Sequence, residues 1–146
     1  MILRRASVAD AQTCAMIQRE ANLASLPFLP ADPDISGAVE FFSTILLVEN
    51  EAWIAELDGQ PAAYVAFHPG WLEHLYVLPG YQGRGIGPAL IAKALEDGTP
   101  RELWTFQKNA RARKFYEDRG WTLVELTDGQ GNREKEPDAR YAWSGN

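Results

Sequence analysis

Two spacings of apolar residues alternate along this chain, and they predict strands interleaved with helices. Apolar runs typical of β-strands occupy residues 2–6, 52–56, 62–67, 71–78, 101–106, 121–127 and 140–143. Helical stretches begin after Ser7 and also occupy residues 36–44, 88–97 and 110–119. This order predicts an α/β (α+β) fold in which about four helices flank a mixed sheet. For a chain of 146 residues we expect one domain spanning residues 1–146.

Local signals mark several element boundaries. Ser7, with Asp10 three residues later, is typical of a capped helix start. Asp58-Gly59 between two apolar runs indicates a hairpin, and Gly120 indicates the end of a helix. The apolar stripe of the first helix is predicted to contain Ala11, Met16, Ile17 and Ala21.

The most informative segment is the glycine-rich loop after the strand at 71–78. It precedes a helical stretch and reads Pro79-Gly80-Tyr81-Gln82-Gly83-Arg84-Gly85-Ile86-Gly87. Glycine tolerates positive φ and lets the main chain approach a ligand closely, because it has no Cβ. A helix start adds N–H groups without acceptors and a partial positive charge, and both favour an anion. The loop therefore predicts a phosphate-bearing cofactor.

Two familiar nucleotide-binding loops do not fit this segment. A P-loop requires a Lys-Ser or Lys-Thr pair after its last glycine, where this chain has Pro88-Ala89. A dinucleotide-binding loop requires an acidic residue about 20 residues later, where this chain has the strand-like segment Trp104-Thr105-Phe106.

Two motifs together resemble the GNAT superfamily of N-acetyltransferases. The first resembles the acyl-CoA pyrophosphate loop of that family and reads Gln82-x-x-Gly85-x-Gly87. The second resembles the family's helix beside the cofactor and reads Asn109-x-x-Ala112-x-x-Phe115-Tyr116-Glu117-x-x-Gly120-Trp121. The resemblance covers residues 71–121. It implies a single-domain GNAT fold with a mostly antiparallel central sheet, splayed beside the glycine loop at a cleft for acetyl-CoA.

The resemblance also implies which residues hold acetyl-CoA. Backbone N–H groups from Gly83 to Gly87 would bind the pyrophosphate, and the main chain at Val77 would polarise the thioester carbonyl. Arg84 either adds charge to this site or is a solvated loop arginine. The implied cofactor-binding residues are Leu75, Tyr76, Val77, Gln82, Gly83, Arg84, Gly85, Ile86, Gly87, Asn109 and Tyr116. An asparagine at position 109 would also cap the following helix.

Candidate acid and base groups are few. By resemblance, the Tyr116 hydroxyl protonates the departing thiolate, since a phenol with a pKa near 10 suits a thiol near 8.5. The alternative is that Tyr116 only packs its helix. Glu73 is the first candidate for removing the amine proton, because alternation places it on the same strand face as Val77. His74, on the opposite face, is the second candidate, and His68 is expected in a loop.

The helix that carries Tyr116 also carries a basic cluster. Arg113 and Lys114 each stand four residues before an acid, Glu117 and Asp118 respectively. We expect a solvated, ion-paired face. The alternative is a contact with the adenosine 3′-phosphate.

Two loops are expected to shape an acceptor pocket. Residues 26–34 contain three prolines and offer Asp32 and Asp34 as partners for an ammonium group. Residues 128–138 form the second loop, for which a hairpin tip or a dimer contact is the alternative. Core packing is expected for the five tryptophans, which all fall on predicted strands: Trp53, Trp71, Trp104, Trp121 and Trp143.

Composition narrows the classes of partner. Fourteen basic and twenty acidic residues give a net charge of −6, which disfavours nucleic acid and mildly favours a cationic substrate. No apolar run is long enough to span a bilayer, so we expect no membrane partner. The single cysteine, Cys14, is expected to be buried and fits a cytoplasmic location. Two histidines and one cysteine show no metal-ligand spacing, so no metal is predicted.

These observations predict an acetyl-CoA-dependent N-acetyltransferase that moves an acetyl group directly to a primary amine, with a small-molecule acceptor favoured. One alternative is acetylation of a protein N-terminus or lysine side chain. Another is a non-catalytic CoA-binding regulatory module. Dimers are frequent in the family that the chain resembles, which leaves a homodimer open.

Overall fold

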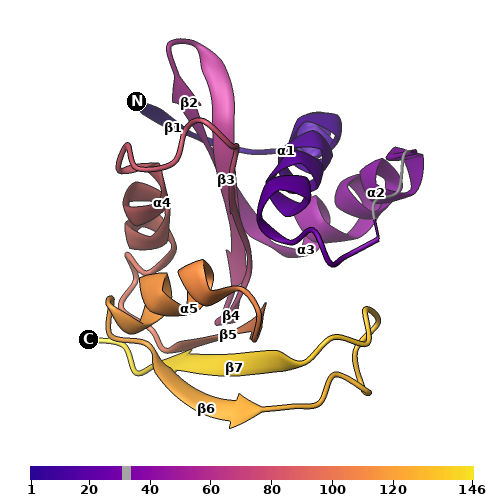
Figure 1. Ribbon diagram of the computed structural model, residues 1–146. Coiled ribbons are helices and arrows are strands. Elements are labelled where there is room, and N and C mark those ends of the chain that lie inside the picture. The colour runs from indigo at the N-terminus through magenta and orange to yellow at the C-terminus, as the bar shows by residue number, and fades with distance from the viewer. Residues whose placement is uncertain (31–33) are drawn as a thin grey trace. The chain divides into compact units, whose positions relative to one another are not determined.

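The computed structural model describes residues 1–30 and 34–146. The chain forms two compact units: unit 1 comprises residues 1–68 and 72–96, and unit 2 comprises residues 69–71 and 97–146. Each unit has its own strands and helices (Figure 1). Asp32, one of the candidate partners for an ammonium group, lies outside the described residues.

Unit 1 carries helices on both faces of its strands. The strands are β1 (Ile2–Arg5), β2 (Glu51–Leu57), β3 (Gln60–His68) and β4 (Gly70–Val77), the last of which starts in unit 2. The helical segments are η1 (Val8–Asp10), α1 (Ala11–Ser25), α2 (Ser36–Phe41), η2 (Phe42–Leu46), α3 (Leu47–Glu49) and α4 (Ile86–Ala94). Figure 1 shows α4 on one side of β2 and β3, with α1 and α2 on the other.

Unit 2 contains three complete strands and one helix, in addition to the start of β4. They are β5 (Arg101–Phe106), α5 (Ala110–Glu117), β6 (Thr122–Leu126) and β7 (Asp138–Trp143). The first two residues of β4 pair in parallel with β5, whereas β5–β7 and β6–β7 are antiparallel, as are β1–β2 and β2–β3. The strand order β1-β2-β3-β4-β5-β7-β6 confirms the predicted mixed, mostly antiparallel sheet.

The predicted turn and cap signals are present in the structure. The Ser7 backbone N–H donates to Asp10 Oδ2 over 2.9 Å in a capping box that starts η1, which continues into α1. Asp58 and Gly59 have φ of 53° and 77° and join β2 to β3. Two successive positive φ values are typical of the type I′ turn that the Asp-Gly pair favours.

The helix predicted at 36–44 changes character midway. After α2 the chain continues as the π-helical segment η2 and then as α3. The hydroxyls of Ser43 and Thr44 donate to the Glu40 carbonyl over 3.1 Å and 2.7 Å. Because these side chains compete for a backbone acceptor, the local hydrogen bonding shifts to the wider helix.

The buried stripe of α1 differs from the prediction at one residue. Met16 is 49% exposed, so its assignment to the core is wrong. Cys14 is fully buried, as expected, and burial raises the pKa of its thiol to about 12. The buried residues of this helix are Ala11, Cys14, Ala15, Ile17 and Ala21.

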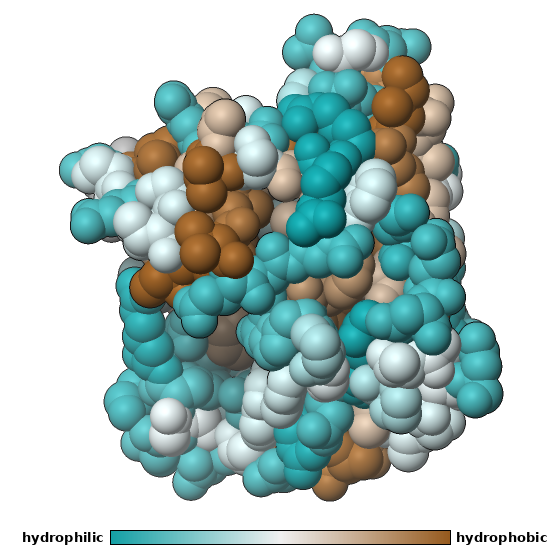
Figure 2. All heavy atoms as spheres, turned by 180° about the vertical axis from the view of Figure 1, so that it is seen from behind, coloured by the Kyte–Doolittle hydropathy of each residue, from teal (hydrophilic) through white to brown (hydrophobic). Residues whose placement is uncertain are grey.

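The helical part of unit 1 exposes an apolar stripe. Phe41, Ile45 and Val48 are 41%, 46% and 62% exposed at nearly helical spacing. Figure 2 shows apolar side chains gathered over the helices α1 to α3. None of the described helices combines the length and the hydropathy that crossing a membrane requires.

Candidate active site

The glycine loop of unit 1 follows directly from β4. The Leu78 N–H donates to Ala62 O over 2.8 Å, and the Tyr81 N–H donates to Leu78 O over 3.1 Å, which turns the chain away from the strand. Gly83 and Gly85 then adopt left-handed φ values of 78° and 79°. Such values favour glycine over every residue that carries a Cβ. Gly85 is the N-cap of α4.

The start of α4 presents main-chain donors. The N–H groups of Ile86 and Gly87 precede any intrahelical acceptor, and Pro88 has no N–H. Ala89 N–H already donates to Gly85 O over 3.2 Å. A Cβ built on Gly83 or Gly85 would meet no atom within 4 Å, so the space beside this backbone is open. Donors, helix dipole and open space together fit a phosphate group.

The side chains of the predicted cofactor-binding residues in unit 1 lie in different environments. Ile86 is 1% exposed and packs inward, so only its main chain can face a ligand. Gln82 is partly buried, and the Arg84 guanidinium lies 5.5 Å from the centre of the Tyr81 ring. The last residues of β4, Leu75, Tyr76 and Val77, are all partly buried.

Glu73 lies on the exposed side of β4. Its carboxylate Oε1 is 3.7 Å from His68 Nδ1, which also hydrogen-bonds Asn50 Oδ1 at 2.8 Å. His68 is the last residue of β3, so the expectation that it lies in a loop is wrong. The short turn at Gly70 brings the two strand ends together. Glu73 therefore has a titratable neighbour that period-2 alternation along one strand could not reveal.

His74 faces the core of unit 1, opposite to Glu73, as alternation predicted. Its Nδ1 shares a 2.8 Å hydrogen bond with the Tyr64 hydroxyl, and its ring lies 5.7 Å from that of Phe42 and 5.4 Å from that of Tyr76. Burial lowers the pKa of His74 to about 4 and raises the pKa of Tyr64 well above its usual value. His74 is therefore neutral at pH 7.

In unit 2, α5 holds the second group of predicted residues. Asn109 caps the helix, and its Oδ1 accepts from the Ala112 N–H over 3.1 Å. Tyr116 is 7% exposed, and its ring makes edge contacts with Phe115 and Trp121 at centroid distances of 5.2 Å and 5.5 Å.

The end of α5 is closed by Gly120. This glycine has a φ of 86°, and the next residue, Trp121, donates its N–H to Tyr116 O over 3.1 Å. The Gly120 N–H donates to Glu117 O over 3.3 Å, which completes a Schellman motif. The helix stop that Gly120 predicted is thus present, and it fixes the turn of helix that carries Tyr116.

The basic cluster on α5 is only partly ion-paired in the predicted way. Lys114 Nζ lies 3.0 Å from Asp118 Oδ2, which confirms one i, i+4 pair. Arg113 instead donates through Nε to the Tyr141 hydroxyl over 2.9 Å, and that hydroxyl donates to Glu117. The direct Arg113–Glu117 pair is wrong, because Tyr141 on β7 stands between the two charges.

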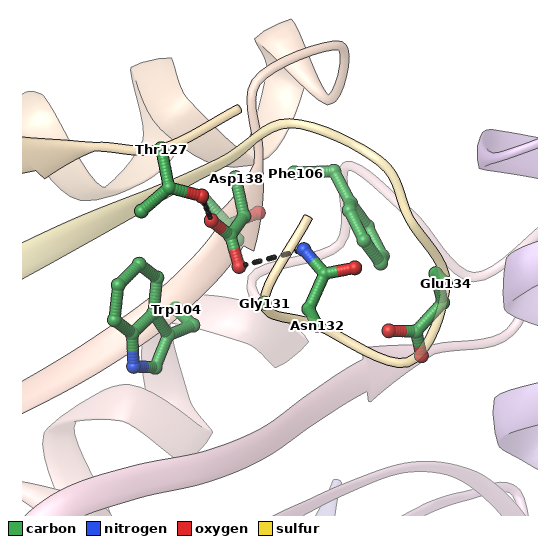
Figure 3. Close-up of a pocket in the computed structure, with 8 residues that line it drawn as sticks. Trp104, Phe106, Thr127, Gly131, Asn132, Glu134 and Asp138 are labelled. Carbon is green, nitrogen blue, oxygen red and sulfur yellow. Dashed lines mark hydrogen bonds between the residues drawn. The ribbon is translucent and has the colours of Figure 1, made fainter. Parts of the chain in front are cut away.

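Unit 2 also contains a pocket of about 540 Å³, which we call the β6–β7 pocket (Figure 3). Figure 3 shows Asn132 between Asp138 and Glu134, with Trp104 and Phe106 on either side. Half of its lining residues belong to the second loop expected to shape an acceptor site, residues 128–138. Its lining residues are Trp104, Thr105, Phe106, Thr127, Gly131, Asn132, Glu134 and Asp138.

Comparison with known proteins identifies the family. Residues 17–121 match the profile of the Acetyltransferase (GNAT) family, which is well over half of the chain. This chain belongs to the GNAT family. An uncharacterized N-acetyltransferase from Archaeoglobus fulgidus is 38% identical over 79 residues, covering 43% of this chain and 54% of the relative. The peptidyl-lysine N-acetyltransferase YiaC from Escherichia coli is 31% identical over 80 residues, covering 54% of this chain and 55% of the relative.

Solved GNAT structures share the fold. The PaiA N-acetyltransferase from Thermoplasma acidophilum, in complex with coenzyme A, has a TM-score of 0.77 at 20% identity and covers 98% of both chains. At this identity the likeness establishes the fold alone. The matched region spans about half the length of the two curated relatives (54% and 55%).

One pocket residue of this GNAT chain was assigned wrongly from the sequence. Trp104 was expected in the core, yet it is 44% exposed and forms a wall of the β6–β7 pocket. Its neighbour Leu103 is 2% exposed and occupies the inward position of β5. The alternation of β5 therefore contained the signal, because two adjacent strand residues cannot both face the same side.

Proposed function

We propose that this GNAT chain transfers the acetyl group of acetyl-CoA directly to a primary amine. The observation that carries the proposal is the glycine loop, where left-handed Gly83 and Gly85 leave open space beside the donors of α4. Backbone N–H groups from Gly83 to Gly87, with Gln82, would hold the pyrophosphate. The coenzyme A bound to the Thermoplasma acidophilum relative supports this choice of cofactor.

The main chain at the end of β4 would polarise the thioester. The N–H of Val77 is the proposed donor to the carbonyl oxygen as negative charge develops there. Donors of this kind commonly contribute about 10²- to 10³-fold in rate. The side chains of Leu75 and Tyr76 would only position this backbone, and Tyr76 does so by packing against His74 at 5.4 Å.

Glu73 would remove the amine proton. An alkylammonium has a pKa of about 10.4, so a base is needed at neutral pH. The Glu73 carboxylate is exposed, so an amine can reach it, and it lies 3.7 Å from His68 Nδ1. His74 is the weaker candidate, since its pKa is lowered to about 4 by burial and its Nδ1 is engaged by Tyr64.

Tyr116 would act as the general acid. The amine nitrogen forms a bond to the acetyl carbon, the carbon–sulfur bond breaks, and the Tyr116 hydroxyl gives its proton to the sulfur. A phenol with a pKa near 10 matches a thiolate whose thiol lies near 8.5. Asn109 would bind the pantetheine arm while its Oδ1 caps α5.

We favour a small-molecule acceptor, which the acidic and aromatic β6–β7 pocket supports. Acetylation of a peptide lysine is the second candidate, because a relative of this chain carries that activity in its name. We further propose that residues 1–146 act as one catalytic domain. A non-catalytic CoA-binding module would keep the loop but would not need Glu73 and Tyr116.

The test is acetyl transfer by the full chain to a panel of small amines and lysine peptides, followed by thiol release. We expect activity with at least one amine and a loss of about 10²-fold or more in Tyr116→Phe, with unchanged affinity for acetyl-CoA. The control is Tyr81→Phe, which removes a phenol outside the proposed acid chemistry. Binding of acetyl-CoA without transfer to any amine would instead support the alternative of a non-catalytic CoA-binding module.

A further inference from the structure

We propose that the β6–β7 pocket of unit 2 binds an organic ammonium group carried by a small-molecule acceptor. Its walls combine the aromatic rings of Trp104 and Phe106 with the carboxylates of Glu134 and Asp138. The identification of this cation as the acetyl acceptor rests on the proposed function.

The charge of the pocket selects a cation. Two carboxylates line it, and none of its eight lining residues is a lysine or an arginine. Three nearby basic side chains have partners of their own: Lys108 with Glu136 at 3.3 Å, Lys135 with Gln130 O at 2.7 Å, and Arg140 with Glu102 and Glu125. Arg133, on the same loop, is not among the lining residues. An anion such as a phosphate of CoA would meet like charge here.

The aromatic walls favour a cation attached to apolar groups. Trp104 is 44% exposed, and the Arg140 guanidinium already lies 5.9 Å from the centre of its ring, so a ligand would use the remaining exposed surface of the indole. An ammonium group over an indole is attracted by the negative face of the ring, while attached methylene groups bury apolar surface. The volume of about 540 Å³ suits a small organic molecule.

The bottom of the pocket is preorganised around Asp138. Thr127 donates its hydroxyl to one carboxylate oxygen of Asp138, and Asn132 Nδ2 donates to the other over 3.1 Å (Figure 3). Gln107 Nε2 donates to the carbonyls of both Thr127 and Asp138 over 2.8 Å and 3.0 Å. A carboxylate held on both oxygens keeps its charge in place before a ligand arrives, which lowers the entropic cost of binding.

The loop that carries Glu134 is closed on itself. Asn132 Nδ2 also donates to Glu136 O over 2.7 Å, and Asn132 Oδ1 accepts from the Glu136 N–H over 3.3 Å. Within the described residues, the Glu134 carboxylate makes no hydrogen bond or ion pair with the chain. Glu134 is therefore a charge that lines the pocket and remains available to a ligand.

The experiment is a titration of the isotope-labelled full chain with butylamine, and with butanol as the neutral analogue, followed by NMR. We expect butylamine to shift the Trp104 indole and Asn132 side-chain amide signals saturably, whereas butanol does not. Glu134→Gln should weaken butylamine binding about threefold to tenfold, and Trp104→Leu by a similar factor. The matched control, Asp128→Asn, removes a carboxylate charge from the same loop outside the pocket lining, keeps an acceptor for the Gln130 N–H, and should change the affinity less than twofold.

Equal losses in Glu134→Gln and Asp128→Asn would overturn the proposal, as would shifts with butanol equal to those with butylamine. A peptide with a single lysine serves as the second arm. Binding of 1,4-diaminobutane tighter than this peptide supports a small-molecule acceptor, and the reverse overturns that assignment. Acetyl-CoA binding is measured on the same samples. A loss of acetyl-CoA binding would contradict the proposed function, whereas a loss of butylamine binding alone would contradict the ammonium site.

Discussion

His74 is a histidine held neutral among the aromatic residues of unit 1, and stability should depend on that state. The pKa of His74 is lowered to about 4 in the folded protein, against 6.5 for an unperturbed histidine. Between these values the unfolded chain binds a proton that the folded chain does not. The free energy of unfolding should therefore fall, by up to about 3 kcal/mol, as the pH drops from 6.5 to 4.

This prediction is checked by urea unfolding at several pH values. His74→Gln keeps a hydrogen-bond acceptor for Tyr64 but cannot titrate, so its stability should depend less on pH over this range. A parent slope that His74→Gln leaves unchanged would contradict the account of His74.

Glu73 allows a second prediction at the residue scale. If this carboxylate removes the amine proton, Glu73→Gln should lower kcat/KM about 100-fold at pH 7. The loss should shrink near pH 9.5, because more of the amine is then already deprotonated. Steady-state kinetics at both pH values give the comparison, with Glu96→Gln as an exposed control. A loss that is the same at both pH values would assign Glu73 to binding rather than proton removal.

At the scale of elements, the start of α4 is the centre of the proposed cofactor site. Gly87 and Gly37 are each the second residue of a helix, α4 and α2 respectively, and neither has a positive φ. Gly87→Val should weaken acetyl-CoA binding at least about tenfold, because a bulky residue at the helix start would hinder the approach of a phosphate to the proposed backbone donors. Gly37→Val, the matched control, should leave the affinity unchanged, and both should change stability by less than about 1 kcal/mol, because the helix propensities of glycine and valine differ by less than that. Calorimetry measures the affinity for acetyl-CoA, and thermal unfolding measures the stability. Equal affinities of the Gly87→Val and Gly37→Val variants would contradict the proposed phosphate site.

The β6–β7 loop depends on one glycine. Gly129 has a φ of 81°, and an added Cβ would lie 2.3 Å from the Glu136 carbonyl carbon. Gly129→Ala should therefore cost about 1–3 kcal/mol of unfolding free energy. Gly131→Ala, two residues away, has no atom within 4 Å of the added Cβ and should cost much less. Denaturant unfolding of both variants tests this, and similar costs would contradict the loop geometry.

The elements that could be predicted from the sequence are those set by local signals. Asp58-Gly59 marked the hairpin, Ser7 and Asp10 the capped start, and Gly120 the end of α5, because each depends on the conformation of adjacent residues. The glycine loop could also be recognised from the sequence, because its resemblance to the GNAT family depends only on the spacing of Gln82, Gly85 and Gly87.

The features that were missed depend on distant or competing partners. Arg113 meets Tyr141 across 28 positions of sequence, which no helical spacing reveals. The π-helical turn η2 arises from Ser43 and Thr44 competing for the Glu40 carbonyl. Trp104 was placed in the core by its residue type, whereas the exposed face of β5 decided its position.

At the scale of the whole molecule, net charge and cofactor charge are of the same sign. The chain carries −6 at neutral pH, and acetyl-CoA carries phosphates. Long-range attraction would therefore not favour acetyl-CoA binding, and we propose that the local donors between Gly83 and Gly87 provide the attraction. The proposed acceptor, by contrast, is a cation that the net charge attracts.

The most direct test of the account is a calorimetric titration of the full chain with acetyl-CoA, with NADH as the control. NADH also contains a pyrophosphate and an adenosine but has no pantetheine arm. The account predicts saturable, one-to-one binding of acetyl-CoA and no saturable binding of NADH. Absence of acetyl-CoA binding would contradict it and would leave the glycine loop as a structural turn between β4 and α4.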